Sequence, residues 1–458
     1  MYLQRKIDEW LIDWKQKKDH LPALVVGVRQ CGKTESIKKF GSANYDNMIY
    51  MNFWTDVTCA KDFEGTLNFD EVISNISIRF PNEKIMPKKT LIFLDEIQEC
   101  PRARLFFKNA YQDGRYDVIG SGSYIGLNGY IVGDATPVPT GYEDVYKMKT
   151  MDFEEFLWAN NYNQDHIKVI EEAFLNKTPV PDPAHELFKK LFNQYMCIGG
   201  FPRAVSAFLE NHNIMDGIRV LDGIRFDMMS DFGRRVKKDG TPVFKPAEVA
   251  RIRKVFELIP TFLAKDSKRF IVSKINSGST IEKNNAIEYL VQTGVICKAY
   301  NLTSPSLPLL GNKIDSQFKI FPTDIGISTS MYGIETISAI NSGNLGYAKG
   351  ALYEALVADS LYKAEVDVFY FAKESGLEID FVICYDGDSY LVEAKAKNGN
   401  AKSAKTVMNN EEHYGKTKLL KIGDYNVGMI NDIITIPHYM TFLIGRKTQV
   451  LFDDLSSK

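Results

Sequence analysis

The stretch that decides the fold is GVRQCGKT, residues 27–34, which follows the apolar run Leu24, Val25 and Val26. It is a full match to the phosphate-binding pattern GxxxxGK[ST]. Its two glycines allow backbone N–H groups to turn toward phosphate oxygens with no Cβ in the way. A helix that begins near Lys33 would direct its positive end toward the same anion. The stretch therefore predicts a P-loop that binds a nucleoside triphosphate.

The P-loop side chains have distinct expected roles. Lys33 supplies a positive charge to the β and γ phosphates and is a catalytic residue, while the Thr34 hydroxyl can ligate Mg²⁺. The expected cofactors are therefore ATP and Mg²⁺. Nucleotide contacts are expected from the loop and the first helical turn, which comprise Gly27, Gln30, Cys31, Gly32, Lys33, Thr34 and Glu35.

A second acidic motif completes the predicted ATPase site. The apolar run of residues 91–94 leads directly into Asp95 and Glu96. Asp95 is placed to hold Mg²⁺, and Glu96 to polarise the attacking water. Alone, two acids after a strand would more often cap the next helix, but the P-loop makes that the weaker alternative. At the end of a further run, Ser121 or Ser123 is a candidate to contact the γ-phosphate, although a simple Gly/Ser turn explains them almost equally well.

Composition is that of an ordinary globular protein. The chain has 458 residues, 45% of them hydrophobic and 25% charged, with a formal net charge of −2. That length predicts two to four domains. The near-zero net charge gives no global basic field, so any nucleic-acid contact would need a local patch. The six cysteines are widely scattered with no CxxC pair, which indicates reduced thiols and hence a cytoplasmic protein. No apolar run approaches the ~20 residues that span a bilayer, so no membrane partner is expected.

The order of apolar runs predicts an α/β chain of three domains. Runs at residues 24–26, 48–53, 91–94 and 118–119 alternate with helical stretches, which favours a P-loop NTPase parallel sheet. A helix is expected over residues 152–175. The expected domains are a P-loop ATPase domain (1–177), a helical lid with a winged-helix-like fold (184–335) and a nuclease-like α/β domain (340–458). For the middle part, a generic helical linker domain is the alternative.

The C-terminal part carries a second candidate site. Asp380 lies on one strand-like run, and Glu393 and Lys395 lie on the next. If the two strands form a hairpin, their side chains converge, so the two carboxylates could bind a divalent cation and Lys395 could activate water against a phosphodiester. Glu354, on the preceding helix, would add a third metal-ligating carboxylate. The alternative is an ordinary edge hairpin whose polar residues alternate with apolar ones.

Basic residues near this site have two interpretations. Lys397, Lys402 and Lys405 follow the second strand. They could steer a nucleic-acid backbone to the site, or they could simply solvate a helix. The six histidines have no partners at metal-ligand spacing and receive no role.

Several motifs together resemble a known family. GVRQCGKT, LIFLDEIQ, VIGSGS, MDFEEFL and GGFPRAV occur in that order. This order is similar to that of prokaryotic AAA-type ATPases of the archaeal-type group, whose relatives also carry a winged-helix-like middle and a nuclease-like tail. The likeness implies that Lys33 and Thr34 bind nucleotide and Mg²⁺, that Asp95 coordinates the metal, and that Glu96 is the catalytic acid. Glu354, Asp380 and the ExK string at 393–395 resemble a PD-(D/E)xK nuclease, a restriction-endonuclease-like fold.

The chain departs from the family at one point. Many relatives have an arginine after a glycine shortly before the FEEF stretch, but here Tyr142 follows Gly141. This puts any arginine-finger assignment in doubt. Arg203, Arg234 and Arg235 are alternatives, each of them more typical of a surface residue.

Three functions compete at this stage. The first is an ATP-driven switch or motor coupled to a nuclease-like domain. The second is a nucleotide-regulated module in which the winged helix binds DNA and the C-terminal fold is a scaffold. The third is a signalling ATPase that grips a protein partner. Expected partners are thus ATP, with DNA, a protein partner or a second copy of the chain as further candidates.

Overall fold

The structure is a computed structural model of the chain, and it describes residues 1–124, 141–233, 241–265, 268–275, 277–342, 349–395 and 401–445. Contacts divide the chain into two compact units. Unit 1 comprises Met1–Thr150 with Gln292–Gly294, and unit 2 comprises Met151–Val291 with the residues from Val295 onward. The contact-based division therefore differs from the three expected domains.

Unit 1 is built on a sheet of five parallel strands in the order β2-β3-β4-β1-β5. The strands are β1 (Ala23–Gly27), β2 (Asn47–Asn52), β3 (Thr90–Asp95), β4 (Asp117–Gly122) and β5 (Asp144–Met148). The helices are α1 (Lys6–Gln16), α2 (Lys33–Asn44), α3 (Phe69–Arg79) and α4 (Pro101–Asp113). The parallel sheet predicted from the sequence is confirmed.

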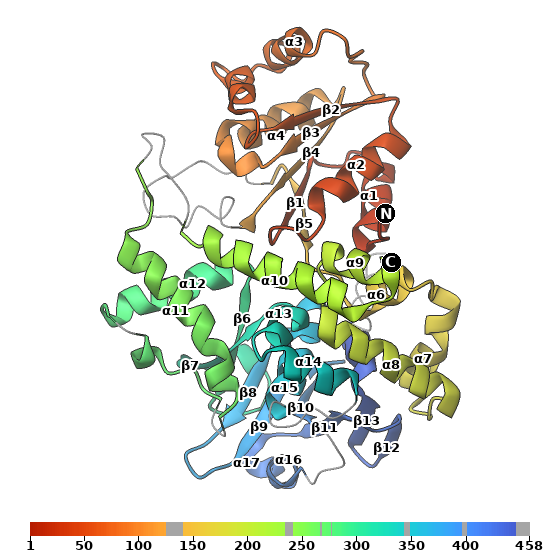
Figure 1. The fold of residues 1–458 in the computed structure, drawn as a ribbon, viewed down its shortest axis with the longest axis vertical. Helices are drawn as coiled ribbons and strands as arrows, with labels where there is room; N and C mark the ends of the chain where they lie inside the picture. The colour runs from red at the N-terminus through yellow and green to blue at the C-terminus, as the bar shows by residue number, and fades with distance from the viewer. Residues whose placement is uncertain are drawn as a thin grey trace. The chain divides into compact units, whose positions relative to one another are not determined.

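Helices cover both faces of this sheet (Figure 1). Every residue of β1 and β3 is buried, as expected for strands packed on both sides. On one face, Leu24, Ile92 and Leu94 belong to a core that includes Phe106 of α4 and Val72 of α3. On the other face α2 packs closely, because a Cβ at its Gly41 would lie 2.5 Å from Met48 Sδ.

Unit 2 begins with helices that are shorter than predicted. In place of one helix over residues 152–175, the structure has α6 (Phe153–Ala159) and α7 (Gln164–Asn176). The break has a local cause: Asn161 has a positive φ of 66°, and the Asn163 side chain caps α7 by accepting from the backbone N–H groups of Asp165 and His166. The prediction of a single helix was therefore wrong.

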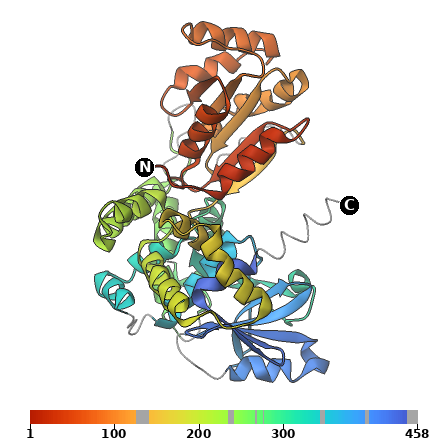
Figure 2. The ribbon, with the colours of Figure 1, turned by 90° about the vertical axis from the view of Figure 1, so that its right-hand side faces the viewer.

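The rest of unit 2 combines a helical layer with a large sheet. Its helices are α8 (Asp182–Ile198), α9 (Pro202–Asn211), α10 (Ile214–Asp231), α11 (Pro246–Leu263), α12 (Thr280–Gln292), α13 (Ile325–Ser330), α14 (Ile334–Asn341), α15 (Lys349–Lys363), α16 (Lys402–Met408) and α17 (Glu411–Tyr414). Helices α8 to α10, yellow-green in Figures 1 and 2, pack against one another, and α8 also packs on α13 and α14.

The eight strands described in unit 2 form one mixed sheet in the order β12-β13-β11-β10-β9-β8-β6-β7. They are β6 (Ile296–Leu302), β7 (Lys313–Pro322), β8 (Phe369–Ala372), β9 (Glu378–Tyr385), β10 (Asp388–Ala394), β11 (Thr417–Gly423), β12 (Gly428–Ile430) and β13 (Ile433–Pro437). The hairpin expected for Asp380 and Glu393 is present, because β9 and β10 are antiparallel neighbours.

Strands β6 and β7 belong to the same sheet as the C-terminal strands. Tyr300 and Asn301 of β6 pair in parallel with Phe369 and Tyr370 of β8. Asn301 adds two side-chain hydrogen bonds to the backbone of Ala372. The expected boundary near residue 340 thus falls inside one continuous sheet.

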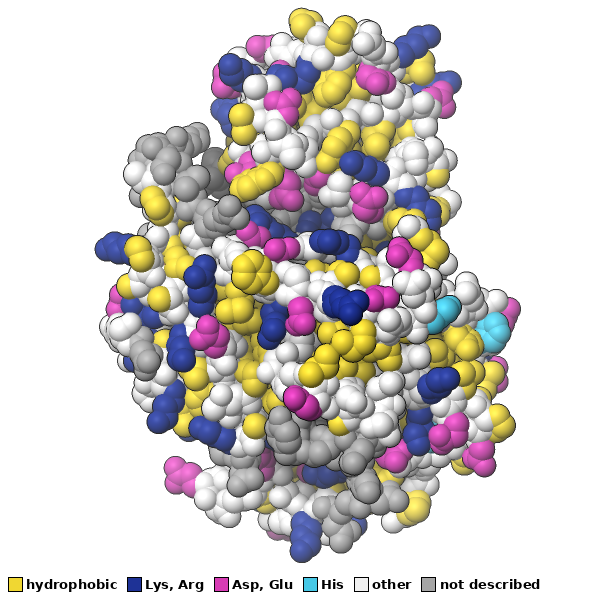
Figure 3. Space-filling view, viewed as in Figure 1, with side chains coloured by type: hydrophobic (Ala, Val, Ile, Leu, Met, Phe, Trp, Pro, Cys, Tyr) yellow, Lys and Arg dark blue, Asp and Glu magenta, His cyan; other side chains and the backbone are white. Residues whose placement is uncertain are grey.

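Charged side chains of both signs are spread over the face shown in Figure 3, in keeping with the small net charge. Among the described residues, no helix combines the length and the apolar character that a membrane crossing requires.

Candidate functional site

The predicted P-loop connects the carboxyl end of β1 to the start of α2. Gln30 and Gly32 have positive φ values of 64° and 104°, which fold the loop back over the amino end of the helix. A Cβ at Gly27 would lie 2.3 Å from the carbonyl oxygen of Met148, so only glycine fits beside β5. Lys33 is buried, and its Nζ donates to the carbonyl oxygens of Gly27 at 3.1 Å and Val28 at 3.0 Å. The backbone of the loop thus holds the ammonium group of Lys33 in place.

Asp95 is the centre of the predicted site and is only 2% exposed. Thr34 Oγ1 of the P-loop donates to Asp95 Oδ2 at 3.1 Å. Ser121 is fully buried and donates to Asp95 Oδ1. The structure therefore brings together three residues that the sequence placed on three separate segments. The hydroxyl of Ser121 already donates to Asp95. If Ser121 also contacts the nucleotide, as predicted, that contact lies next to Asp95.

Two further contacts of Asp95 were not predicted. Tyr50 OH donates to Asp95 Oδ2 at 2.9 Å, and Asn52 Nδ2 donates to the same oxygen at 3.0 Å. Burial raises the pKa of Tyr50 to about 12, so the phenol remains a donor at neutral pH. Both residues lie near the carboxyl end of β2, the neighbour of β3. Their position at that sheet edge, two residues apart, is the signal that could have revealed them.

Glu96 directly follows β3 in a left-handed conformation, with φ of 52°. Its backbone N–H donates to Asp95 Oδ1 at 3.1 Å, and Gln98 Nε2 donates to Glu96 Oε2. The carboxylate of Glu96 is half-buried, so it is oriented but still reachable from solvent. This geometry suits a residue that orients or deprotonates water.

The remaining predicted P-loop residues lie around this centre. Cys31 is fully buried, and its Sγ lies 3.7 Å from the carbonyl oxygen of Met148. Gln30 is half-buried and Glu35 is exposed on the first turn of α2. Arg5, which the sequence did not single out, donates to the carbonyl oxygen of Cys31 at 2.6 Å and so supports the loop from outside.

The C-terminal candidate site lies wholly within unit 2. Glu354 of α15, Asp380 of β9 and Glu393 of β10 are all buried, being 2%, 9% and 3% exposed. Asp380 Oδ2 accepts from the backbone N–H of Ala394 at 2.9 Å. Lys395 Nζ lies 2.6 Å from Glu393 Oε2 and 3.7 Å from Asp380 Oδ2. The hairpin thus brings Asp380, Glu393 and Lys395 together as predicted.

Two lysines that the sequence analysis missed also enter this cluster. Lys268 Nζ pairs with Glu354 Oε1. Lys319 of β7 is fully buried, and its Nζ lies 3.6 Å from Glu354 Oε2 and 2.9 Å from Glu378 Oε1. An isolated lysine within an apolar strand gives no local sequence signal for such a role.

Burial dominates the electrostatics of the C-terminal cluster. Burial and the negative charge of Asp380 raise the pKa of Glu354 and of Glu393 to about 7, although the neighbouring lysines oppose the shift. Burial alone would lower the pKa of Lys319, but the surrounding carboxylates raise it above its ordinary value. The same balance applies to Lys395.

The carboxylate oxygens suit a hard cation, but lysine ammonium groups already neutralise them. No group of three or more His, Cys, Asp or Glu side chains is arranged to hold a metal ion in the part of the chain that the structure describes. As they stand, Glu354, Asp380 and Glu393 do not fit a divalent cation. Their role as metal ligands stays a prediction from the sequence that the geometry does not favour.

The P-loop, the acidic strand end and the parallel sheet together agree with a comparison to known families. Residues 19–157 match the family model of an AAA domain. An AAA domain therefore covers most of unit 1 and the first residues of unit 2. Residues 189–338 and 349–439 match two domains of unknown function, DUF8612 and DUF4143. No curated protein matches the chain at a significant level.

Solved structures similar to the chain are remote. The Aeropyrum pernix ORC2 protein, in ADPNP–ADP complexes, is 13% identical, with 75% of this chain and 94% of that chain covered and a TM-score of 0.37. ORC1 of the same organism, in complex with DNA, is 12% identical, with 73% and 92% covered and a TM-score of 0.29. AMPPCP-bound DnaA from Aquifex aeolicus is 13% identical, with 62% and 86% covered and a TM-score of 0.26. Scores this low do not establish a common arrangement of the whole chain.

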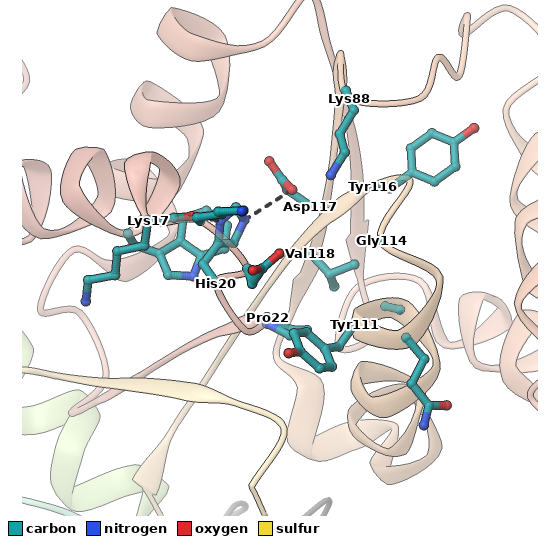
Figure 4. A pocket seen from close by; sticks show the side chains of 14 residues that line it. Lys17, His20, Pro22, Lys88, Tyr111, Gly114, Tyr116, Asp117 and Val118 are labelled. Atoms are coloured by element: carbon teal, nitrogen blue, oxygen red, sulfur yellow. Dashed lines mark hydrogen bonds and ion pairs between the residues drawn. The ribbon is translucent and has the colours of Figure 1, made fainter.

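A cavity of about 550 Å³ lies at the opposite edge of the AAA domain's sheet (Figure 4). Its lining includes His20, Pro22 before β1, and Asp117 at the start of β4, so it is at the amino ends of these strands. His20 Nε2 lies 3.2 Å from Asp117 Oδ1, and this hydrogen bond raises the pKa of His20. Because the P-loop follows the carboxyl end of β1, the cavity is not the nucleotide site.

One string outside the AAA domain has the letters of the guanine-reading pattern NKxD. It is NKID, residues 312–315, in unit 2 at the start of β7. Asn312 Nδ2 donates to the carbonyl oxygen of Ser306 at 2.8 Å, and Lys313 Nζ pairs with Asp315 at 2.7 Å. These local contacts account for the string, so ATP remains the predicted nucleotide.

The FEEF and GGFP stretches meet in a buried network of unit 2. A Cβ at Gly200 would lie 2.0 Å from the carbonyl oxygen of Met151, just before FEEF. Gly200 N donates to Asp324 Oδ2 at 2.9 Å. Lys363 Nζ pairs with Asp359 Oδ2 at 3.0 Å and with Asp324 Oδ2 at 3.4 Å. These stretches therefore have a structural role in this unit.

The other sequence candidates are surface residues or lie outside the described part of the chain. Arg203 is exposed on the first turn of α9, and Lys402 and Lys405 are exposed on α16. Arg234, Arg235 and Lys397 lie outside the described residues.

Proposed function

We propose that the chain is a Mg²⁺-dependent ATPase that works as a nucleotide-driven switch. The observation that carries this proposal is the contact of 3.1 Å between Thr34 Oγ1 and Asp95 Oδ2. It joins the P-loop to the acidic end of β3, which is where the two oxygen ligands expected for Mg²⁺ must meet. In the described residues, the hydrogen bonds to the carboxylate of Asp95 come from four neutral side chains and the backbone N–H of Glu96, so its negative charge stays available to a cation.

The roles of the residues follow from these contacts. Thr34 and Asp95 would hold Mg²⁺, which supplies charge neutralisation at the β and γ phosphate oxygens when bound. Lys33, once it exchanges its two carbonyl partners for phosphate oxygens, binds the triphosphate. Glu96 orients water or takes a proton at Oε1, while Gln98 fixes the other carboxylate oxygen.

For the C-terminal fold we propose a scaffold or binding role rather than cleavage. The observation behind this choice is that Glu354, Asp380 and Glu393 are paired with lysines. A switch of this kind needs a partner, and DNA, a protein and a second copy of the chain are the candidates.

The proposal is tested by ATP turnover of the purified full chain with Mg²⁺, against an EDTA control. We expect Mg²⁺-dependent release of phosphate, and stronger competition by unlabelled ATP than by GTP. Repeating the assay with duplex DNA identifies DNA as the partner if turnover changes. Absence of turnover under all these conditions, with intact ATP binding, would leave a nucleotide-binding protein without hydrolysis. Tighter GTP than ATP binding would contradict the choice of nucleotide.

A further inference from the structure

Lys319 is placed to act as a permanent internal cation. It lies on β7 opposite Ala299 of β6, a small residue that leaves room for the long side chain. Its Nζ passes 4.8 Å from the centre of the Tyr370 ring and ends between Glu354 and Glu378. The side chain of Lys319 is fully buried.

Among the described residues, every carboxylate of the cluster has a lysine within ion-pair distance. The carboxylates are those of Glu354, Glu378, Asp380 and Glu393, and the lysines are Lys268, Lys319 and Lys395. Buried carboxylates must be paired or must bind a metal. Here pairing is achieved by side chains of the chain itself.

Glu354 depends on Lys319 in a specific way. Glu354 Oε2 is buried and has no hydrogen-bond partner, and Lys319 Nζ likewise has none that meets hydrogen-bond geometry. The 3.6 Å ion pair between these two atoms is therefore the main compensation for that oxygen. A divalent cation bound at Glu354 would have to share this space with a buried ammonium of the same sign.

We propose that Lys319 takes the place of the divalent cation that the carboxylates of this cluster would otherwise bind. The wild-type cluster then binds no divalent metal, and Lys319 locks α15, β7 and β9 together as a metal would. This inference is independent of the ATPase proposal, because every residue in it lies in unit 2.

The test is calorimetric titration of Mn²⁺ into the nucleotide-free full chain. Binding that is lost in an Asp380→Asn variant reports the C-terminal cluster. We expect no such binding in the wild type. In Lys319→Met we expect this binding to appear, because the buried ammonium that repels a cation of the same sign is gone. Lys313→Met changes a half-buried lysine at the start of the same strand, which pairs with Asp315 outside the cluster, and should behave as the wild type.

Two outcomes would overturn the proposal. One is Mn²⁺ binding by the wild type that disappears with Asp380→Asn. The other is a Lys319→Met variant that is folded, as shown by a circular dichroism spectrum and an unfolding transition like those of the wild type, and that still binds no Mn²⁺.

If Lys319→Met does not fold, the double variant Lys319→Met/Glu354→Gln shows whether the unpaired charge of Glu354 is the cause. Removing the partner charge should restore folding if Lys319 is the counter-ion of Glu354. Failure to restore it would contradict the proposal.

Discussion

Asp95 in the AAA domain and the acidic cluster of unit 2 are both buried carboxylate centres with a lysine nearby, yet they are compensated in opposite ways. At Asp95, the side-chain hydrogen bonds come from hydroxyl and amide groups of Thr34, Tyr50, Asn52 and Ser121, and the backbone N–H of Glu96 adds another. The neighbouring Lys33 is instead held by backbone carbonyl oxygens. In unit 2, ammonium groups contact the carboxylates directly.

The difference shows that acidic motifs alone do not define a cation site. A carboxylate surrounded by neutral donors keeps its negative charge available to a metal. One that is paired with a buried lysine has already been neutralised, and breaking that pair is costly. We therefore interpret the first centre as open to Mg²⁺ and the second as closed by its own side chains.

The largest effect on ATP turnover and nucleotide binding is expected from removing Lys33, the lysine of the P-loop. Lys33→Ala should abolish ATP hydrolysis and weaken nucleotide binding strongly, because the phosphates lose the lysine of the loop. Turnover and nucleotide affinity measured on the same preparation check this. Lys39→Ala, an exposed lysine on the same helix, is the matched control. Normal turnover in Lys33→Ala would show that the ATPase site is not at the P-loop of unit 1.

Glu96→Gln should separate binding from chemistry. Nucleotide affinity should stay near the wild-type value, since Asp95 and Thr34 are intact, while turnover should fall by about 10²–10⁴-fold. Equilibrium binding and steady-state turnover provide the two numbers, with Glu99→Gln as a control. If turnover were unchanged, another group would be the base.

The sequence predicted the P-loop, Asp95, Glu96 and the parallel sheet because each depends on local patterns. The P-loop is a contiguous string, and buried strands appear as contiguous apolar runs. Tyr50, Lys268 and Lys319 were missed because their roles depend on distant pairing. Lys319, for example, acquires its partners only when β7 joins the C-terminal sheet.

The same limit explains the domain boundaries. A helix that ends at Gly294 and passes into the apolar run of residues 295–300 suggested a winged-helix-like unit. Nothing in the sequence near residues 296–302 shows that β6 pairs with β8, about 70 residues later in the chain. Long-range strand pairing of this kind leaves no local trace.

A smaller effect is expected from the neutral donors of Asp95. Tyr50→Phe removes one hydrogen bond to its carboxylate, which should lower the free energy of unfolding by about 1 kcal/mol. Turnover should fall only a few-fold, because Thr34, Asn52 and Ser121 still donate. Chemical denaturation and the ATPase assay measure the two effects. Complete loss of activity would mean that Tyr50 takes part in the chemistry.

The smallest effect is a pH dependence of stability, and it concerns the buried ion pairs of Lys363 with Asp359 and Asp324. Burial raises the pKa of Asp359 to about 7, although Lys363 opposes the shift. The folded state therefore binds a proton that the unfolded state releases near its ordinary pKa, and stability should fall as pH rises from about 4 to about 7. This slope is at most about 1.4 kcal/mol per pH unit. It should flatten in Asp359→Asn, as followed by denaturation across pH. An equal slope in wild type and variant would contradict the assignment.

The most direct test of the contrast is the number of Mn²⁺ ions that the full chain binds in the presence of a non-hydrolysable ATP analogue. An open centre at Asp95 and a closed cluster at Lys319 predict one ion per chain, lost in Lys33→Ala together with the nucleotide. Two ions per chain, with the second lost in Asp380→Asn, would contradict the account.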